Sequence, residues 1–264
     1  MTEHPLAVVT GGSRGLGAAI AAELGARGVR IVLLDLTPPA EALPAGWRYL
    51  QVDVADRGAV AESLATITDD AGHPPDILVN NAGTHATGAS ADLPQADWQR
   101  VIDVNLTGAW NCSQVFGAAM VATGRGSIVN ISSINASVGM PGRAAYSAAK
   151  AGLLGLTRVL AVEWAPMGVR VNAVQPGYLH TDLIEQAVAA GLYSWSQLRQ
   201  RIPLGALGMP AQVATAVAFL VSSEASYITG QSLIIDGGYV SEGSVVPGVG
   251  ASAFRPDTLT GHVD

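Results

Sequence analysis

Short apolar segments rich in Val, Ile and Leu alternate along the chain with longer segments whose apolar residues recur at a helical period. The expected strands span residues 6–10, 30–35, 48–52, 76–79, 127–132, 169–174 and 232–236. The expected helices span residues 16–27, 56–70, 95–104, 106–123, 146–165 and 210–221. Strands that alternate with helices form right-handed crossovers, so the pattern predicts an α/β fold with a parallel sheet. The strands are apolar on both sides, which indicates helices on both faces of that sheet.

No linker rich in Pro, Gly and Ser, no internal repeat and no block of charges interrupts this alternation, so we expect one domain over residues 1–240. Its segment 178–208 mixes aromatic and polar residues and is expected to form a substrate loop with short helices. The tail, residues 241–264, is rich in Gly, Val and Pro and extends the same domain. It is either a frayed terminus or an arm that Phe254 and Arg255 dock onto a neighbouring subunit.

Composition and charge exclude several classes of function. A net charge of −7 without a cluster of Lys and Arg argues against nucleic-acid binding. No apolar run reaches the roughly 18 residues of a membrane span, and the N-terminus lacks the pattern of a secretory signal. The single cysteine, Cys112, leaves no intrachain disulfide and indicates a reducing cytoplasm. No cluster of His, Cys or Asp has the spacing of metal ligands, so no metal is expected.

A glycine-rich turn follows the first expected strand and reads TGGSRGLG over residues 10–17. Glycine adopts a positive φ without strain and lets the backbone approach a pyrophosphate. The N–H groups at the start of the next helix can then bind the phosphate oxygens. The turn therefore predicts a dinucleotide site, formed by Gly11, Ser13, Arg14, Gly15, Leu16 and Gly17.

Asp35 ends the second expected strand, eighteen residues after Gly17. A carboxylate there can accept hydrogen bonds from the hydroxyls of the adenosine ribose and would repel a 2′-phosphate. This favours NAD over NADP as the cofactor. Arg14 is the opposing observation, because a cation in the turn could instead bind the 2′-phosphate.

The turn also satisfies the Gly-x-Ser-x-Gly pattern of serine hydrolases, with Ser13 at the centre. In those enzymes an earlier strand and loop supply part of the oxyanion hole. Only ten residues precede this turn, so we set the hydrolase interpretation aside.

Tyr146 and Lys150 are four residues apart in an expected helix, so both side chains lie on one face. A phenol with a pKa near 10 is a poor acid–base catalyst at neutral pH. The ammonium of Lys150, which is the only lysine in the chain, and the positive ring of NAD⁺ would both lower that pKa. Ser133, at the end of an expected strand, could donate a hydrogen bond to the same substrate oxygen. The three side chains predict acid–base catalysis of hydride transfer.

With these motifs the chain resembles the short-chain dehydrogenase/reductase family over roughly residues 5–240. The motifs shared with the family are Thr10-Gly11-x-x-x-Gly15-x-Gly17, Asp53-Val54, Asn80-Asn81-Ala82-Gly83, Asn105, Ser133, Tyr146-x-x-x-Lys150 and Pro176-Gly177-x-x-x-Thr181. The resemblance implies a single Rossmann-type domain whose seven parallel strands have the order 3-2-1-4-5-6-7.

The resemblance also implies a role for each matched position. Tyr146 would be the general acid and base, Ser133 would polarise the substrate oxygen, and Lys150 would lower the pKa of the tyrosine and bind the nicotinamide ribose. Asn105 would hold a water molecule linked to Lys150. Further cofactor contacts would come from Asp53, Val54, Asn81, Ala82, Gly83, Pro176, Gly177, Leu179 and Thr181. For Thr181, capping of the next helix is an equal alternative.

Substrate specificity is expected in the segment 178–208 and beside Ser133. The candidate pocket residues combine aromatic and hydrogen-bonding groups and are Asn135, Met140, Tyr178 and Trp195, with His85, His180 and Tyr193 as further candidates. Such a lining suits a sugar, a polyol or a cyclic alcohol.

The sequence therefore predicts an NAD-dependent oxidoreductase that acts on a secondary alcohol or ketone. An NADPH-dependent ketone reductase and a non-catalytic dinucleotide-sensing regulator are the alternatives. The resemblance further implies a homotetramer, with a dimer as the next possibility, assembled through the expected helices 106–123 and 146–165.

Overall fold

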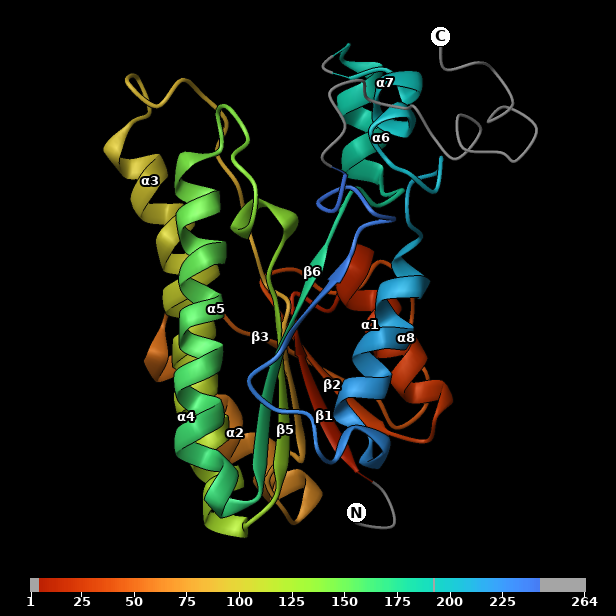
Figure 1. Ribbon diagram of the computed structural model, residues 1–264. Coiled ribbons are helices and arrows are strands. Elements are labelled where there is room, and N and C mark those ends of the chain that lie inside the picture. Colours follow the sequence, from red (N-terminus) through yellow and green to blue (C-terminus); the bar gives the residue numbers. More distant parts are fainter. Residues whose placement is uncertain (1–4, 192, 243–264) are drawn as a thin grey trace, which may run out of the picture.

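The computed structural model describes residues 5–191 and 193–242. Seven parallel strands form one sheet in the order β3-β2-β1-β4-β5-β6-β7 (Figure 1). The strands are β1 (Leu6–Thr10), β2 (Arg30–Asp35), β3 (Arg48–Gln51), β4 (Ile77–Asn80), β5 (Gly126–Ile131), β6 (Val169–Pro176) and β7 (Ser232–Ile235). The predicted fold, a single α/β domain of Rossmann type with this strand order, is confirmed.

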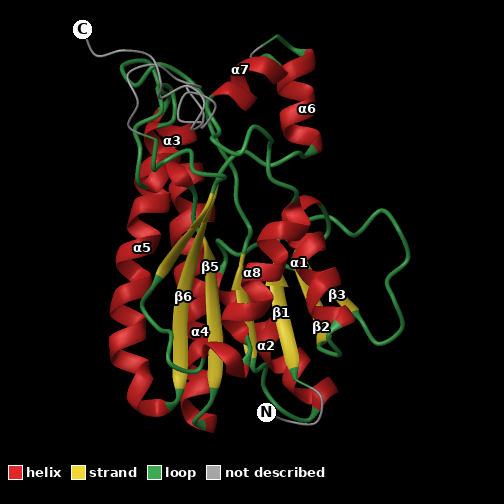
Figure 2. Ribbon diagram, turned by 45° about the vertical axis from the view of Figure 1, so that its right-hand side comes forward, coloured by secondary structure: helices red, strands yellow, loops and turns green. Residues whose placement is uncertain are grey.

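Helices cover both faces of the sheet, as Figures 1 and 2 show. On one face α1 (Gly15–Ala26) packs beside α8 (Pro210–Val221). On the other face lie α2 (Arg57–Ala71), α4 (Gly108–Thr123) and α5 (Ala144–Trp164). The molecule therefore has three layers, with the sheet in the middle.

The side chains of β1 alternate between two hydrophobic cores. Leu6 and Val8 belong to the core that includes Phe116 of α4, whereas Ala7 and Val9 belong to the core that includes Ile20 of α1. Successive side chains of a strand point to opposite faces, so an apolar strand fills both cores at once. Burial on both faces fixes the position of β1, and with it the position of the glycine turn that follows.

The carboxyl ends of the strands lie at one edge of the sheet, beside α3 (Gln95–Ile102), α6 (Asp182–Ala189) and α7 (Trp195–Gln200) (Figures 1 and 2). The two short helices α6 and α7 lie in the segment that was expected to form a substrate loop. A parallel bridge between Leu179 and Gly208 joins the two ends of that segment. Phe254 and Arg255 of the tail lie outside the described residues.

The sequence predicts two separate helices, 95–104 and 106–123, but the structure has no break between them. A π-helical turn, Asp103–Thr107, joins α3 to α4. The Nδ2 of Asn105 donates to the Val101 carbonyl at 2.8 Å and to the Thr84 carbonyl at 2.7 Å. The Asn105 side chain thus donates to two carbonyl groups beside the π-helical turn. A helix-weakening residue is tolerated here because it bridges the turn to a neighbouring loop.

The glycine turn packs too closely against β4's end to accept a side chain at Gly17. A Cβ at this position would clash with the carbonyl oxygen of Gly11 and lie 2.5 Å from the Nδ2 of Asn81. Both neighbours are held in place, because Asn81 Nδ2 donates to the carbonyls of Thr10 and Gly11 at 2.9 Å each. Gly17 is therefore required for the turn to close.

We expect Gly17→Ala to lower the free energy of unfolding by about 1–3 kcal/mol, since the added methyl group must displace the turn. Urea denaturation of the purified protein measures this loss. Gly88→Ala is the matched control, because a Cβ at Gly88 meets nothing within 4 Å, and its effect should stay within about 0.5 kcal/mol. Equal stabilities of the two variants would show that the turn does not need the close approach.

Candidate active site

The glycine turn and the end of β4 form one hydrogen-bonded unit. Gly11 and Gly15 have φ values of +60° and +57°, which side chains other than glycine rarely adopt. The hydroxyl of Thr10 accepts hydrogen bonds from the N–H groups of Asn81, at 3.0 Å, and Ala82, at 2.9 Å. Asn81 therefore braces the turn with its side chain instead of leaving that side chain free for a ligand. Thr10, which the sequence placed in the motif without a role, is its partner in this brace.

The turn presents groups that an anion could bind. Arg14 and Gly15 are exposed at the start of α1, and Arg14 caps no N–H group of the helix with its side chain. The Oγ of Ser13 is buried and has no hydrogen-bond partner among the described residues. A buried hydroxyl without a partner costs free energy, which a bound phosphate oxygen would offset. The residues present fit a dinucleotide phosphate at this helix N-terminus.

Acidic side chains lie at the ends of β2 and β3. The half-exposed Asp35 accepts hydrogen bonds from the N–H of Ser13, at 3.0 Å, and of Thr37, at 3.3 Å. Asp53 is exposed and accepts from the N–H of Ala55 at 2.9 Å, while the neighbouring Val54 is buried. The edge of the sheet beside the turn is therefore negatively charged, as the sequence predicts for the adenosine end of a dinucleotide site.

Asn105 lies beneath the segment that follows β4. Its Oδ1 is buried without a hydrogen-bond partner among the described residues, and a Cβ at Gly83 would lie 2.8 Å from that oxygen. Gly83 has no side chain and thus leaves space beside the Asn105 Oδ1, an acceptor that no described residue uses. This geometry suits the expected role of Asn105 as the holder of a water molecule.

Ser133, Tyr146 and Lys150 come together where β5 ends and α5 begins. The Ser133 side chain is near enough to the Tyr146 phenol to lower its pKa. The Ser133 hydroxyl donates to the Oδ1 of Asn135 at 3.3 Å and accepts from the N–H of Asn135 at 3.2 Å. The Nζ of Lys150 lies 5.6 Å from the centre of the Tyr146 ring. It is buried and donates to the carbonyl of Ile131 at 2.7 Å. The structure thus brings the three predicted catalytic side chains into contact range.

The pKa shift of Tyr146 differs in direction from the sequence prediction. Burial raises the pKa of the Tyr146 phenol, and the hydrogen bond from Ser133 and the charge of Arg143 oppose that rise. Burial lowers the pKa of Lys150 to about 8. The sequence led us to expect that Lys150 lowers the pKa of the tyrosine. In the protein alone, the loss of hydration of both groups outweighs that attraction.

The segment after β6 begins at the same edge of the sheet. Pro176 is buried, and the N–H of Gly177 donates to Ile235 at 2.9 Å. Leu179 packs partly buried against the core under α1 and α8. Thr181 is the N-cap residue of α6 but makes no side-chain capping hydrogen bond. Its hydroxyl is therefore not used to cap the helix.

Two of the expected substrate residues meet, since the hydroxyl of Tyr178 lies 3.8 Å from the Sδ of Met140. The Tyr178 ring also packs edge-on against Tyr193, at 6.2 Å, and Tyr239, at 5.6 Å. Trp195 instead stacks on the exposed His180 at 5.2 Å. Among the described residues, no aromatic pair joins Trp195 to Tyr178.

Two residues of this region were missed by the sequence analysis. Tyr239 lies beyond the last strand and packs on both Tyr178 and the guanidinium of Arg201. Arg143 acts electrostatically on Tyr146 and Tyr178. Only the spacing of three residues between Arg143 and Tyr146 could have indicated a shared face; nothing in the sequence indicated Tyr239.

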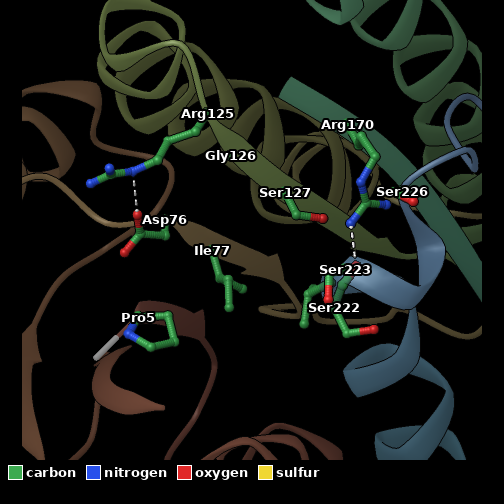
Figure 3. A pocket seen from close by; sticks show the side chains of 11 residues that line it. Pro5, Asp76, Ile77, Arg125, Gly126, Ser127, Arg170, Ser222, Ser223 and Ser226 are labelled. Carbon is green, nitrogen blue, oxygen red and sulfur yellow. Dashed lines mark hydrogen bonds and ion pairs between the residues drawn. The ribbon is translucent and has the colours of Figure 1, made fainter. Parts of the chain in front are cut away.

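A separate cavity of about 190 Å³ lies at the opposite end of the sheet, beside the amino ends of β4 and β5 (Figure 3). Its two arginines already have partners, as Arg125 pairs with Asp76 at 2.9 Å and Arg170 donates to the Ser222 carbonyl at 3.0 Å. We therefore assign the candidate site to the carboxyl edge. In residues 5–191 and 193–242, no three His, Cys, Asp or Glu side chains form a group that could hold a metal ion. No helix in that part of the chain has the length and apolarity to cross a membrane.

Comparisons with known proteins agree with the geometry of this site. A family model described as enoyl-(acyl carrier protein) reductase matches residues 11–240. The NAD-dependent glycerol dehydrogenase of Listeria innocua is 38% identical over 240 residues, which cover 89% of this chain and 93% of that protein. The cis-4-hydroxycyclohexanecarboxylate dehydrogenase of Sinomonas cyclohexanicum is 42% identical over 244 residues, 89% of this chain and 96% of the relative.

Among solved structures, the aldohexose dehydrogenase of Thermoplasma acidophilum superposes with a TM-score of 0.86 at 34% identity. The match covers 92% of this chain and 96% of that protein. With relatives this similar over nearly their whole length, the chain belongs to the short-chain dehydrogenase/reductase family of oxidoreductases.

Proposed function

We propose that this oxidoreductase transfers a hydride between NAD(H) and a carbon that bears a hydroxyl or keto group, with Tyr146 as the general acid and base. The observation that carries the proposal is the contact of three side chains at the carboxyl edge. Ser133 is near enough to the Tyr146 phenol to lower its pKa, and the Nζ of the buried Lys150 lies 5.6 Å from the centre of the Tyr146 ring. This group lies at the same edge of the sheet as the glycine turn that follows β1.

The dinucleotide would be held by the turn at Ser13 and Gly15, by Asp35 at the adenosine end and by Lys150 at the nicotinamide ribose. When bound, it supplies the acceptor or donor of the hydride. The protein supplies the proton chemistry. In the oxidative direction the Tyr146 phenolate accepts the proton of the substrate hydroxyl, while the Ser133 hydroxyl orients the same oxygen. In the reductive direction the phenol donates that proton.

Lys150 and Asn105 would connect the phenol to solvent through a water molecule. The Nζ of Lys150 is anchored by the carbonyl of Ile131, so its other hydrogens can face the ribose and the tyrosine. The unused Oδ1 of Asn105 is a suitable acceptor for a water molecule that exchanges protons with Lys150. The two residues would thus carry a proton away from Tyr146 after each oxidation and return one to it after each reduction.

NAD is the proposed cofactor because Asp35 places a carboxylate at the adenosine end. The glycerol dehydrogenase of L. innocua, which is named NAD-dependent, supports this choice. The exposed Arg14 favours the alternative, as does a similar structure, a putative 2-deoxy-D-gluconate 3-dehydrogenase with bound NADP. We give Asp35 more weight, since its carboxylate accepts from the N–H of Ser13 and is thereby held in the turn.

The proposed substrates are secondary alcohols and ketones of the sugar, polyol or cyclic alcohol class. Tyr178, Met140 and Asn135 line the cleft beside Ser133 with partly buried aromatic and polar groups. Relatives named for glycerol, galactitol and cis-4-hydroxycyclohexanecarboxylate support this range.

We further propose a homotetramer that assembles through α4 and α5. These helices expose Trp110, Val159 and Val162, whose side chains are 38%, 53% and 78% accessible. Apolar groups exposed to this extent on neighbouring helices are typical of a protein interface. A cytoplasmic location also stays a proposal, supported by the single, buried cysteine.

Replacing the catalytic hydroxyl tests the proposal directly. Tyr146→Phe should lower kcat by roughly 10²–10⁴-fold on the best substrate of a panel of polyols, sugars and cyclic alcohols, because the proton has no acceptor. NADH binding, measured by fluorescence, should persist. Tyr227→Phe, at a fully exposed position, is the control and should be as active as wild type. Substantial turnover by Tyr146→Phe would refute the role of the tyrosine, and inactivity of the wild type on the whole panel would favour the sensing regulator.

The rate of oxidation should depend on pH through the phenolate. Only the ionised phenol accepts a proton, so kcat/KM for oxidation should rise with pH as Tyr146 ionises. The hydrogen bond from Ser133 lowers the pKa of this phenol, so Ser133→Ala should raise the pKa and move the rise to higher pH. Profiles from about pH 6 to about pH 10, under conditions where hydride transfer limits the rate, measure the displacement. A flat profile, or one that the substitution leaves in place, would contradict the mechanism.

Cofactor preference depends on one carboxylate. We expect wild type to bind NADH at least about 10-fold more tightly than NADPH, because Asp35 repels the 2′-phosphate. Asp35→Asn should narrow this ratio, since the amide removes the charge and still accepts from the N–H of Ser13. Fluorescence titration gives both affinities, with Asp69→Ala on the exposed side of α2 as the control. A preference of the wild type for NADPH would establish the alternative cofactor.

A further inference from the structure

Arg143 lies at the rim of the cleft, immediately before α5. It is the N-cap residue of that helix and precedes Tyr146 by three residues, so the two side chains start on the same side of the helix. Its N–H donates to the Met140 carbonyl at 3.2 Å, and its carbonyl accepts from Ser147 at 2.8 Å. The preceding residue, Gly142, accepts from the N–H of Gly88 at 3.2 Å. The backbone that carries Arg143 is therefore fixed between two loops of the cleft.

The guanidinium of Arg143 has no partner among residues 5–191 and 193–242. Among the described arginines that are at least partly buried, Arg30 contacts His73, Arg170 donates to backbone carbonyls, and Arg201 lies over a tyrosine ring. Arg143 is also partly buried, yet no hydrogen bond, ion pair or ring contact of its guanidinium is found within the described residues. In a chain with a net charge of −7, carboxylates to pair with an arginine are abundant elsewhere.

The charge of Arg143 acts on three rings that belong to different segments of the cleft. Burial raises the pKa of Tyr146, and Arg143 opposes the rise. Burial and two neighbouring tyrosines raise the pKa of Tyr178 to about 12, again against the effect of Arg143. Burial lowers the pKa of His85, and Arg143 contributes to the decrease. Arg143 is thus close enough to the loop after β4, the start of α5 and the loop after β6 for its charge to act on one ring from each.

The described residues expected to line the substrate site offer this cation no counter-charge. Asn135, Met140 and Tyr178 are uncharged at neutral pH. The other arginine that affects His85 is Arg100, and its charge is already matched by Asp97 at 3.2 Å. Holding a guanidinium partly out of water without a counter-charge costs free energy. An anionic group on the substrate would offset this cost when it binds.

We propose that Arg143 binds a carboxylate of the substrate, so that the enzyme acts on small hydroxy acids or their keto forms. The inference rests on the proposed function and narrows its substrate class. A guanidinium presents a planar fork of N–H donors that matches a carboxylate with two parallel hydrogen bonds. Side chains three residues apart on a helix have Cβ atoms about 5–6 Å apart. The carboxylate should therefore lie only a few bonds from the carbon whose oxygen faces Tyr146.

A neutral polyol of the same size would leave the guanidinium without its counter-charge. Arg143 would then attract acids and also disfavour neutral substrates, because a bound neutral substrate leaves the guanidinium without a counter-charge, which costs free energy. The preference should be visible in binding and in KM, since the carboxylate is bound equally before and during hydride transfer.

The test compares hydroxy acids with their primary amides, which have nearly the same shape and no charge. The probes are lactate, 3-hydroxybutyrate and D-gluconate, each beside its amide. Binding is measured by calorimetry in the Tyr146→Phe protein with NAD⁺ present, so that no turnover occurs. The best-bound acid should bind roughly 10- to 100-fold more tightly than its amide, which is the difference expected for hydrogen bonds to a charged group.

Adding Arg143→Met should abolish the preference for the acid, because the acid then loses its counter-charge and the amide no longer leaves a cation unpaired. Arg143→Lys, which keeps the charge but not the planar fork, should restore part of it. Arg27→Met is the matched control, because Arg27 is exposed at the end of α1 and pairs with Glu23. In the active protein, Arg143→Met should raise KM for the acid relative to KM for the amide.

The outcomes separate this inference from the proposed function. Equal binding of every acid and its amide, or a preference that survives Arg143→Met, would overturn the carboxylate site even if neutral alcohols are oxidised. A preference that depends on Arg143 in a protein that oxidises no member of the panel would support the site and overturn the proposed function.

Discussion

The side chain of Asn81 ties the end of β1 to the end of β4, and the architecture of the cleft depends on this contact. Its Nδ2 donates to two successive carbonyls of the glycine turn, and Thr10 returns the interaction through its hydroxyl. Gly17 allows the helix that follows to approach this brace closely. The parallel sheet brings the remaining groups to the same edge, because the carboxyl ends of all its strands lie there. A rigid turn and a rigid sheet together fix where a dinucleotide could lie relative to Tyr146.

Burial is the second constraint, and it acts on the catalytic group in two directions. It raises the pKa of the Tyr146 phenol and lowers the pKa of Lys150 to about 8, so burial shifts both groups toward their neutral forms, although Lys150 remains mostly protonated at neutral pH. Ser133 and Arg143 act against this for the tyrosine. Each added positive charge or hydrogen-bond donor near the phenol therefore favours the phenolate. A partly closed cleft makes these contributions larger than they would be in water.

Most of the fold could be predicted from the sequence, because apolar runs such as residues 30–35 fill two cores and leave few alternatives to a central strand. The glycine turn and the Tyr146–Lys150 pair were predicted for the same reason: their chemistry depends on spacing along the chain. The π-helical turn at Asn105 was not predicted, since it depends on a hydrogen bond to the distant Thr84.

The substrate side was harder to predict, because its contacts join segments that are far apart in the sequence. Tyr239 meets Tyr178 only after the chain has passed β7 and returned to the cleft. A single arginine before a helix is usually solvated. Arg143 becomes a candidate binding residue only in the fold, where it is partly buried and has no partner among the described residues. The electrostatic state of Tyr146 likewise follows from its burial, which spacing does not report.

The central claim is that the phenol of Tyr146 holds the proton that moves with the hydride. Its pKa can be measured directly by NMR titration of protein labelled with ¹³C at the tyrosine Cζ, with Tyr146→Phe identifying the resonance. We predict a pKa above the usual value for tyrosine in the free protein and a decrease of at least about one unit with NAD⁺ bound, because the positive ring then lies beside the phenol. An unchanged pKa on NAD⁺ binding, or a resonance that never titrates, would contradict the account.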